Sequence, residues 1–554
     1  MKYIIVIGLL LTTGILYVSC NKRLEDFRIN PNNPDVTSAD VDLYLNEAQL
    51  KFTLFWGNDP EFKTSATDLG AALTRMEIMF GPLYTSAYSA GQLDREWSFA
   101  YNGVLKHLDA MLPLAVDRKL YIHAGIAQVL KAYTMMTLVD YFGDVPASEA
   151  NLGIQNTNPK PDKGADIYKG ALGLLDTAIL NFAKSASASP SNDLFYNGDA
   201  KKWTKCAKTL KLRAYLTTRL VDAATSKSKI TELVNDNDLI TADADEFVFR
   251  FSSQQSNPDS RHPNYTNNYR AAGGANDYIG THFLWALLEE KGLTDPRVRY
   301  YMYRQTLVST GWDAFTLPCV VRNKPPHYTA SMPFCIFPNG YWGRDHANNE
   351  GIPPDKDKRT IWGIYPAGGT FDDNQGKPAL LNDGAKGQGI LPVWMASFTD
   401  FLKAEAALTL QTPGDARVLL QSGIRKSIAR VIAYPLQVGI TVPANRVPST
   451  AAIDAYVNKV LTLYDQAATS DDKLNVIIKE WYLALWGNGV DAYNNYRRTG
   501  KPDNFQFAVS PNPGNFIRTF FYPANFVNLN INVEQKPGVT QKTFWDINPD
   551  NLYR

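Results

Sequence analysis

Apolar residues recur at helical spacing through two long parts of the chain. The clearest example predicts a helix over residues 120–141 that ends before Gly143 and Pro146. Its apolar stripe consists of Ile122, Ile126, Val129, Tyr133 and Met136. The same spacing predicts helices over 41–52, 166–182, 203–220, 391–407, 415–431, 453–464 and 471–486. We therefore predict a mostly α fold.

Small residues inside these helices let neighbouring helices approach closely. Examples are Gly125, Ala127, Ala132, Ala171 and Gly173. Together with Tyr they form seams like those of tetratricopeptide helix pairs, but no strict period of about 34 residues is visible. The prediction is therefore degenerate tetratricopeptide-like pairs.

The middle of the chain differs in character from both helical parts. Residues 226–390 are dense in Gly, Pro, Asn, Asp and Tyr, and only one helix, at about 277–291, is expected there. Loops of this length are uncommon unless they build a binding surface. The predicted organisation is a signal peptide over 1–19, a lipidated tether over 20–40, a helical region over 41–225, a loop-rich aromatic region over 226–390, a second helical region over 391–500 and a loop-like tail over 501–554, together one domain.

The first twenty residues are typical of an export signal. A short charged start and an apolar run end at Ser19-Cys20, and the chain then turns polar. A cysteine directly after the cleavage point predicts lipidation of Cys20, so that the mature protein is held at a membrane by lipid and not by peptide. An ordinary secreted protein with an incidental Cys20 stays open as the alternative.

Composition narrows the function classes. Lys and Arg (56) balance Asp and Glu (55), which argues against nucleic acid as a partner. No GxSxG, GxxxxGK[ST] or HExxH motif occurs, so we predict no catalytic residues, metal or cofactor.

Beyond Cys20 the cysteines are Cys206, Cys319 and Cys335. A bridge between the last two is permitted, and spacing alone leaves it open.

Several motifs, in order along the chain, resemble those of the SusD/RagB family, the surface lipoproteins of Bacteroidetes. The most recognisable is 133–146, a helix that runs into Phe-Gly-Asp-Val-Pro. The others are 30–32, 193–199 followed by Lys202-Trp203 and Leu212-Arg213, 295–297, 401–406, 497–500 and Tyr522-Pro523. We predict that these motif residues are mostly structural, with Arg497 and Arg498 bound to carboxylates or helix-end carbonyls.

The resemblance implies a binding protein and not an enzyme. Family members resemble lids on the outer face of the outer membrane, over a TonB-dependent transporter of the SusC type, and capture oligosaccharides or, in some cases, peptides. It therefore implies an outward-facing, lipid-anchored protein whose partners are a SusC-like transporter and a glycan or peptide ligand. A structural or adhesion lipoprotein, with the helix pairs as a protein-binding scaffold, stays open as the alternative.

Aromatic rings beside charged residues are the candidate ligand-binding positions. A sugar stacks its C–H face on a ring and bonds its hydroxyls to Asn, Asp or Arg. The first cluster is Tyr84, Tyr88 and Trp97 with Asp94 and Arg95, the second is Tyr265, Tyr269 and Arg270, and the third is Trp312, Tyr341, Trp342, Arg344 and Asp345. Any single ring is more often a packing residue. We expect the first and third clusters to contact ligand, with Trp97 and Trp342 as exposed anchors.

Overall fold

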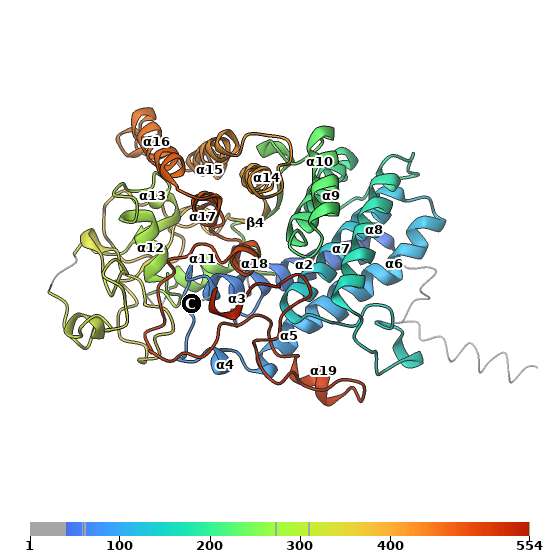
Figure 1. Ribbon diagram of the computed structural model, residues 1–554, viewed down its shortest axis with the longest axis horizontal. Coiled ribbons are helices and arrows are strands. Elements are labelled where there is room, and N and C mark those ends of the chain that lie inside the picture. Colours follow the sequence, from blue (N-terminus) through green and yellow to red (C-terminus); the bar gives the residue numbers. More distant parts are fainter. Residues whose placement is uncertain (1–39, 58, 60–61, 272–273, 309–310, 553–554) are drawn as a thin grey trace, which may run out of the picture.

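Helices predominate in the protein. The computed structural model describes residues 40–57, 59, 62–271, 274–308 and 311–552 (Figure 1). Within these residues, the strands pair into two short two-stranded sheets. The predicted mostly α fold is confirmed. The predicted signal peptide, Cys20 and all of the tether except Asp40 lie outside these residues. No helix of the described part is long and apolar enough to cross a bilayer.

The N-terminal part is a series of packed helices. They are α2 (Val41–Trp56), α3 (Ala66–Leu73), α4 (Tyr84–Ala87), α5 (Asp94–Ser98), α6 (Lys106–Asp117), α7 (Tyr121–Phe142), α8 (Gly164–Phe182), α9 (Ala200–Thr217) and α10 (Ala223–Asp236). The predicted helix over 120–141 is α7, and it ends where Gly143 takes a φ of 77°. α7 packs against α6 and α8. A Cβ on Gly125 would lie 2.4 Å from the ring of Phe182, so this close approach requires glycine.

Short elements joined by long loops form the middle of the chain. They are β1 (Phe247–Arg250), α11 (Pro263–Asn268), α12 (Thr281–Leu288), α13 (Val298–Tyr301), β2 (Met302–Arg304), β3 (Thr360–Trp362) and β4 (Ile390–Trp394). β1 pairs antiparallel with β4, and β2 pairs antiparallel with β3. The helix expected at 277–291 is the shorter α12, because the backbone before it pairs elsewhere: Ile279 bridges Glu77, and Gly280 bridges Arg344. These bridges join the segment after α3 to the middle loops.

The C-terminal helices return to the N-terminal ones. They are α14 (Ala396–Leu410), α15 (Ala416–Gln437), α16 (Thr450–Gln466), α17 (Ser470–Ala484), α18 (Gly489–Thr499) and α19 (Ala524–Asn528). α14 packs against α15 and α17, and α18 packs against α3 (Figure 1). At the α3–α18 contact, a Cβ on Gly70 would lie 2.1 Å from the carbonyl oxygen of Gly489. Two segments more than four hundred residues apart therefore touch backbone to backbone.

Buried polar contacts among the motif residues fasten these helices together. Arg498 donates to both carboxylate oxygens of Glu405, and Arg497 donates to the backbone carbonyls of Asp140 and Arg518 at 2.6 Å. The prediction that these two arginines bind carboxylates and carbonyls is confirmed. Asp140, from the most recognisable motif, accepts from Trp545 Nε1 at 2.9 Å, so the tail is tied into the same network.

Candidate ligand-binding site

The third predicted cluster is buried except for Trp312, which is half-buried. Trp342 is 1 % exposed and packs against Leu317 and the disulfide between Cys319 and Cys335. The bridge that the spacing left open is thus present, and the loop that it closes packs on the Trp342 ring. The prediction that Trp342 is an exposed anchor is therefore wrong, because its ring has no free face for a ligand.

The other buried members of this cluster hold loops in place. The ring of Tyr341 lies 4.6 Å from the guanidinium of Arg304. Asp345 accepts from Gln506 Nε2 at 2.7 Å, and burial raises its pKa to about 6. Arg344 donates to the carbonyl of Gly351 at 2.7 Å. Since each side chain is buried and contacts other groups of the protein, the predicted direct ligand contacts of these three residues are corrected to structural roles.

The first cluster is divided between packing and open positions. Tyr84 is buried, and its hydroxyl bonds Arg75 Nη2 and His346 Nε2, both at 3.0 Å, so its predicted ligand contact is also corrected. Trp97 is half-buried, and its ring contacts those of Tyr101, Phe142 and Phe526 at 4.6–5.2 Å. Tyr88 is half-buried and lines a pocket. Trp97, Tyr88 and Trp312 stay predictions as ligand contacts.

The second cluster is a packing cluster. Tyr265 and Tyr269 are buried and stacked, with ring centroids 4.4 Å apart and planes 8° apart. Their hydroxyls donate to the carbonyls of Asp383 and Trp362, at 2.9 and 2.8 Å. Neither ring is free to receive a ligand.

A pocket of about 190 Å³ lies where the segment around α3 and α4 meets the middle loops. Ile78 N donates to the carbonyl of Tyr278 at 3.2 Å, and Glu77 bridges Ile279. This pairing places the residues after α3 beside Asp277 at the start of the α12 segment. The pocket therefore combines residues that are two hundred positions apart in the sequence.

Two exposed aromatic rings line this pocket. Phe62 and Phe80 are 57 % and 46 % exposed. Each has a guanidinium over its ring, Arg95 at 4.9 Å from the Phe62 centroid and Arg344 at 5.5 Å from the Phe80 centroid. A cation over a ring holds it by attraction to the π electrons. Both rings are therefore held in place while much of their surface stays open.

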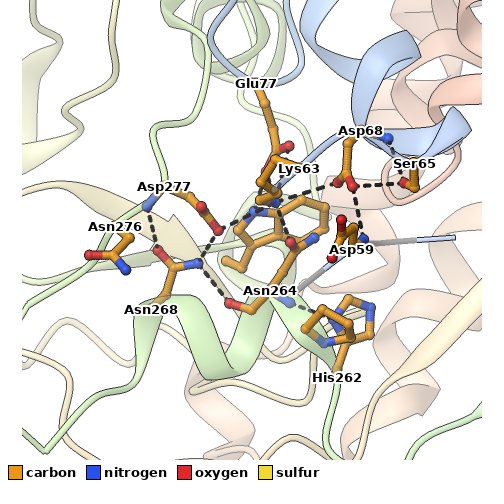
Figure 2. Close-up of polar contacts among 12 residues, drawn as sticks. Asp59, Lys63, Ser65, Asp68, Glu77, His262, Asn264, Asn268, Asn276 and Asp277 are labelled. Carbon is orange, nitrogen blue, oxygen red and sulfur yellow. Dashed lines mark hydrogen bonds and ion pairs between the residues drawn. The ribbon is translucent and has the colours of Figure 1, made fainter. Parts of the chain in front are cut away.

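The floor of the pocket is charged, with Lys63 at its centre (Figure 2). Lys63 Nζ lies 3.2 Å from Glu77 Oε1, 3.4 Å from Asp277 Oδ2 and 3.6 Å from Asp68 Oδ1, and it donates to Asn264 Oδ1. Burial by itself would lower the pKa of Lys63, but the carboxylates of Asp277, Glu77 and Asp68 raise it overall. Lys63 is thus a held ammonium ion and not a free nucleophile.

Each floor carboxylate is positioned by a neighbouring element. Asp68, in the first turn of α3, accepts from the N-cap hydroxyl of Ser65 at 2.7 Å. Glu77 accepts from Trp362 Nε1 of β3 at 2.8 Å, and Asp277 accepts from Asn268 Nδ2 of α11 at 2.7 Å. Burial raises the pKa of Glu77 to about 7, against the effect of Lys63, and the neighbouring carboxylates add to the rise.

A further acidic pair lies behind the floor. Thr64, which lines the pocket, donates to Glu96 Oε1 at 3.0 Å. Burial, and then the nearby Asp59 carboxylate, raises the pKa of Glu96 to about 9. Glu96 is therefore neutral at physiological pH.

The arrangement is suited to binding. The open rings can stack on one face of a ligand. The carboxylates beside them can accept hydrogen bonds from its hydroxyl or amine groups. Among the described residues, no group of three or more His, Cys, Asp or Glu side chains is arranged to hold a metal ion. Three other pockets are larger. Two are about 410 Å³ each, and no aromatic ring lines either of them; the third is about 340 Å³ and is lined by Phe334 and His327, with no Asp side chain and one Glu, Glu350.

The two pocket rings could have been found in the sequence. Phe62 stands in a short polar stretch, and Phe80 precedes Gly81-Pro82. Large apolar residues in such loops met the criterion that was applied to the three clusters. The three predicted clusters each hold several rings close together in the sequence, whereas the pocket assembles single rings from separate loops.

Two protein-family models match the sequence. Residues 37–313 match a model described as starch-binding and associating with the outer membrane, and residues 375–535 match one described as SusD and RagB outer membrane lipoprotein. The chain belongs to the SusD/RagB family. All lining residues of the pocket with Lys63 at its floor fall within the first match. The disulfide and Trp342 lie between the two matches.

Solved structures of SusD/RagB proteins share the fold. A family member from Bacteroides thetaiotaomicron VPI-5482 has a TM-score of 0.65 at 20% identity, and covers 92% of this chain and 100% of its own. A chitin-binding SusD homologue from Flavobacterium johnsoniae has a TM-score of 0.62 at 19% identity, with the same coverage. A SusD homologue from Bacteroides fragilis NCTC 9343 has a TM-score of 0.63 at 17% identity, covering 92% and 99%. No curated protein matches the sequence.

Proposed function

We propose that this SusD/RagB protein captures oligosaccharides at the cell surface, in the pocket formed by Phe62, Phe80 and the floor around Lys63. The supporting observation is the pair of half-open rings beside acidic side chains in one pocket. A pyranose stacks its C–H face on such a ring, while its hydroxyls donate to carboxylates. Nothing in the pocket assigns a reaction, so the proposed role is binding without catalysis.

Glycans are favoured over peptides as the ligand class. The matching family model is described as starch-binding, and two of the similar solved structures are chitin-binding proteins. Those likenesses support a saccharide, while the exposed rings supply the stacking surface that a saccharide needs.

The delivery step is proposed from the family as a whole. Its members are described as outer-membrane lipoproteins, and Cys20 after an export signal is the residue for lipidation. We place the protein on the outer face of the outer membrane, held by lipid at Cys20, where it passes its ligand to a SusC-like TonB-dependent transporter. Cys20→Ala is expected to release it from the membrane fraction of the native host, and affinity purification of the wild type is expected to recover the transporter.

Binding to a panel of starch and chitin oligosaccharides, with a peptide library beside it, tests the proposed ligand class. Stacking on one ring contributes about 1–3 kcal/mol by analogy with base stacking, so Phe62→Ala and Phe80→Ala should each weaken binding by about fivefold or more. Phe315→Ala is the matched control, because Phe315 is 76 % exposed and lies outside the pocket. Binding of peptides alone, or unchanged glycan affinity in both pocket variants, would refute the proposal.

A further inference from the structure

The pocket lining contains more acidic than basic side chains. Asp68, Glu77 and Asp277 contribute three carboxylates, and Lys63 is the one cationic side chain among the described lining residues. All three carboxylates are nearly buried, with side-chain exposures of 1 %, 8 % and 11 %. Charges in such a setting are weakly screened by salt. The pocket thus has a negative floor.

Lys63 balances only part of this charge. Its single ammonium lies within 3.6 Å of each of the three carboxylates. Further guanidiniums beside the pocket are used elsewhere. Arg359 pairs with Asp355 at 2.7 Å and donates to the carbonyl of Asn276 at 3.0 Å. Arg95 pairs with Asp59 at 3.4 Å, and Arg344 donates to backbone carbonyls at 2.7 and 3.0 Å. The guanidiniums of Arg95 and Arg344 also contact the pocket rings. Burial is the main cause of the raised pKa of Glu77, and the carboxylates of Asp277 and Asp68 add to it.

An unpartnered buried donor lies beside the same floor. Asn264 is fully buried and directs its Oδ1 to Lys63, while its Nδ2 has no hydrogen-bond partner (Figure 2). A buried amide donor without a partner costs free energy. The floor therefore combines unbalanced negative charge with a spare hydrogen-bond donor.

We infer that this pocket selects oligosaccharides that carry a protonated primary amine, such as unacetylated amino sugars, over neutral or anionic ones; the inference rests on the proposed glycan-binding function. An ammonium group donates to the floor carboxylates and supplies the missing positive charge. The rings of Phe62 and Phe80 stack on the apolar face of the sugar. That face is the same in protonated, neutral and anionic oligosaccharides. Ligand charge, and not ring shape, is therefore what the floor distinguishes.

Three β-1,4-linked hexasaccharides with one backbone test this selection by calorimetry. The chitosan hexamer carries an ammonium at C2, the chitin hexamer an acetamide, and cellohexaose a hydroxyl. We expect the chitosan hexamer to bind about fivefold or more tightly than the other two, as for a charge pair worth about 1 kcal/mol. Equal or tighter binding of a neutral hexamer overturns the charge inference and leaves the glycan-binding function standing. If none of the three binds, both the function and the inference fall.

Asp277→Asn is the decisive variant. It removes one charge but keeps an oxygen that accepts from Asn268, so the fold is preserved. It should lower affinity for the chitosan hexamer about fivefold and change affinity for cellohexaose less than twofold. Asp454→Asn is the matched control, since Asp454 pairs with Arg425 on the C-terminal helices. A fall of equal size for all hexamers assigns Asp277 to hydroxyl binding and overturns the charge inference. Glu77→Gln, which keeps the acceptor for Trp362, gives a second and independent reading.

Discussion

At the scale of single residues, what covers a ring decides what the ring does. Trp342 packs against Leu317 and the disulfide between Cys319 and Cys335, so we expect Trp342→Ala to lower the free energy of unfolding by about 3–5 kcal/mol, the usual cost for a buried aromatic. Phe315→Ala, at a ring that is 76 % exposed, should change it by less than about 0.5 kcal/mol. Denaturant unfolding measures both. Normal stability of Trp342→Ala with lost ligand binding would restore the original assignment of Trp342 as an anchor.

Glu96 gives a stability prediction with a defined sign. Its pKa is raised to about 9 in the folded protein, mainly by burial, and lies near 4.3 in an unfolded chain. The carboxyl group therefore stays protonated in the folded state while the unfolded state ionises, and stability is lost as pH rises through this window. Glu96→Gln keeps the acceptor for Thr64 and cannot ionise. At about pH 8 it should raise the free energy of unfolding by about 2–4 kcal/mol.

Unfolding curves at several pH values test the Glu96 prediction. The gain in Glu96→Gln should shrink toward about pH 5, where both states of the wild type are increasingly protonated. The matched control is Glu47→Gln, because the Glu47 side chain is 41 % exposed and pairs with Lys51 along α2. A gain that does not depend on pH would show that the substitution acts through packing and not through ionisation.

Residue-level reasoning from the sequence recovered contacts that depend on local chemistry. The buried contacts of Arg497 and Arg498 were predicted, because a guanidinium forms strong charge-assisted hydrogen bonds to carboxylates and carbonyl oxygens. Burial of Trp342 was not, since it depends on a disulfide that the spacing alone could not establish. The pocket floor was also missed: Lys63, Glu77 and Asp277 meet only after the backbone of Glu77 pairs with Ile279.

At the scale of elements, the close backbone contact between α3 and α18 provides a test of the fold. A Cβ on Gly70 would lie 2.1 Å from the carbonyl oxygen of Gly489, and two helix backbones must separate to admit it. We expect Gly70→Ala to destabilise the protein by about 1–3 kcal/mol or more. Gly173→Ala on α8 is the control, because nothing lies within 4 Å of a Cβ there. This exposed position should be neutral or gain up to about 1 kcal/mol.

The apolar period of a helix predicts some of its properties and not others. The stripe over 120–141 predicted α7 to within one residue at each end, and the small residue Gly125 does admit Phe182. Gly173, predicted for the same role, faces open space. A period identifies the buried face of a helix, but the partner on that face is fixed by contacts far away in the sequence. The contact between Gly70 and Gly489 belongs to this second kind.

At the scale of the whole molecule, the loop-like tail is part of the core. Trp545 is fully buried and donates to Asp140 on α7 at 2.9 Å. Asp546 accepts from the buried Arg518 at 2.6 Å. Deleting 543–554 would open a cavity worth about 3–5 kcal/mol and remove the carboxylate partner of a buried arginine at a similar cost. Since whole domains are stable by only about 5–15 kcal/mol, we expect this deletion to prevent stable folding.

Soluble expression and far-ultraviolet circular dichroism measure the effect of the tail deletion. The deleted protein should be insoluble or lose its helical signal at a much lower temperature, although the described part of the deleted segment contains only the 3-10 turn Asp550–Leu552. A shorter deletion, of residues 551–554, keeps Trp545 and Asp546 and should retain the wild-type transition. If the longer deletion melted like the wild type, the tail would be an appendage. Asp140 also binds Asn494 of α18. We therefore expect loss of the tail to weaken the α3–α18 contact and, through it, the pocket.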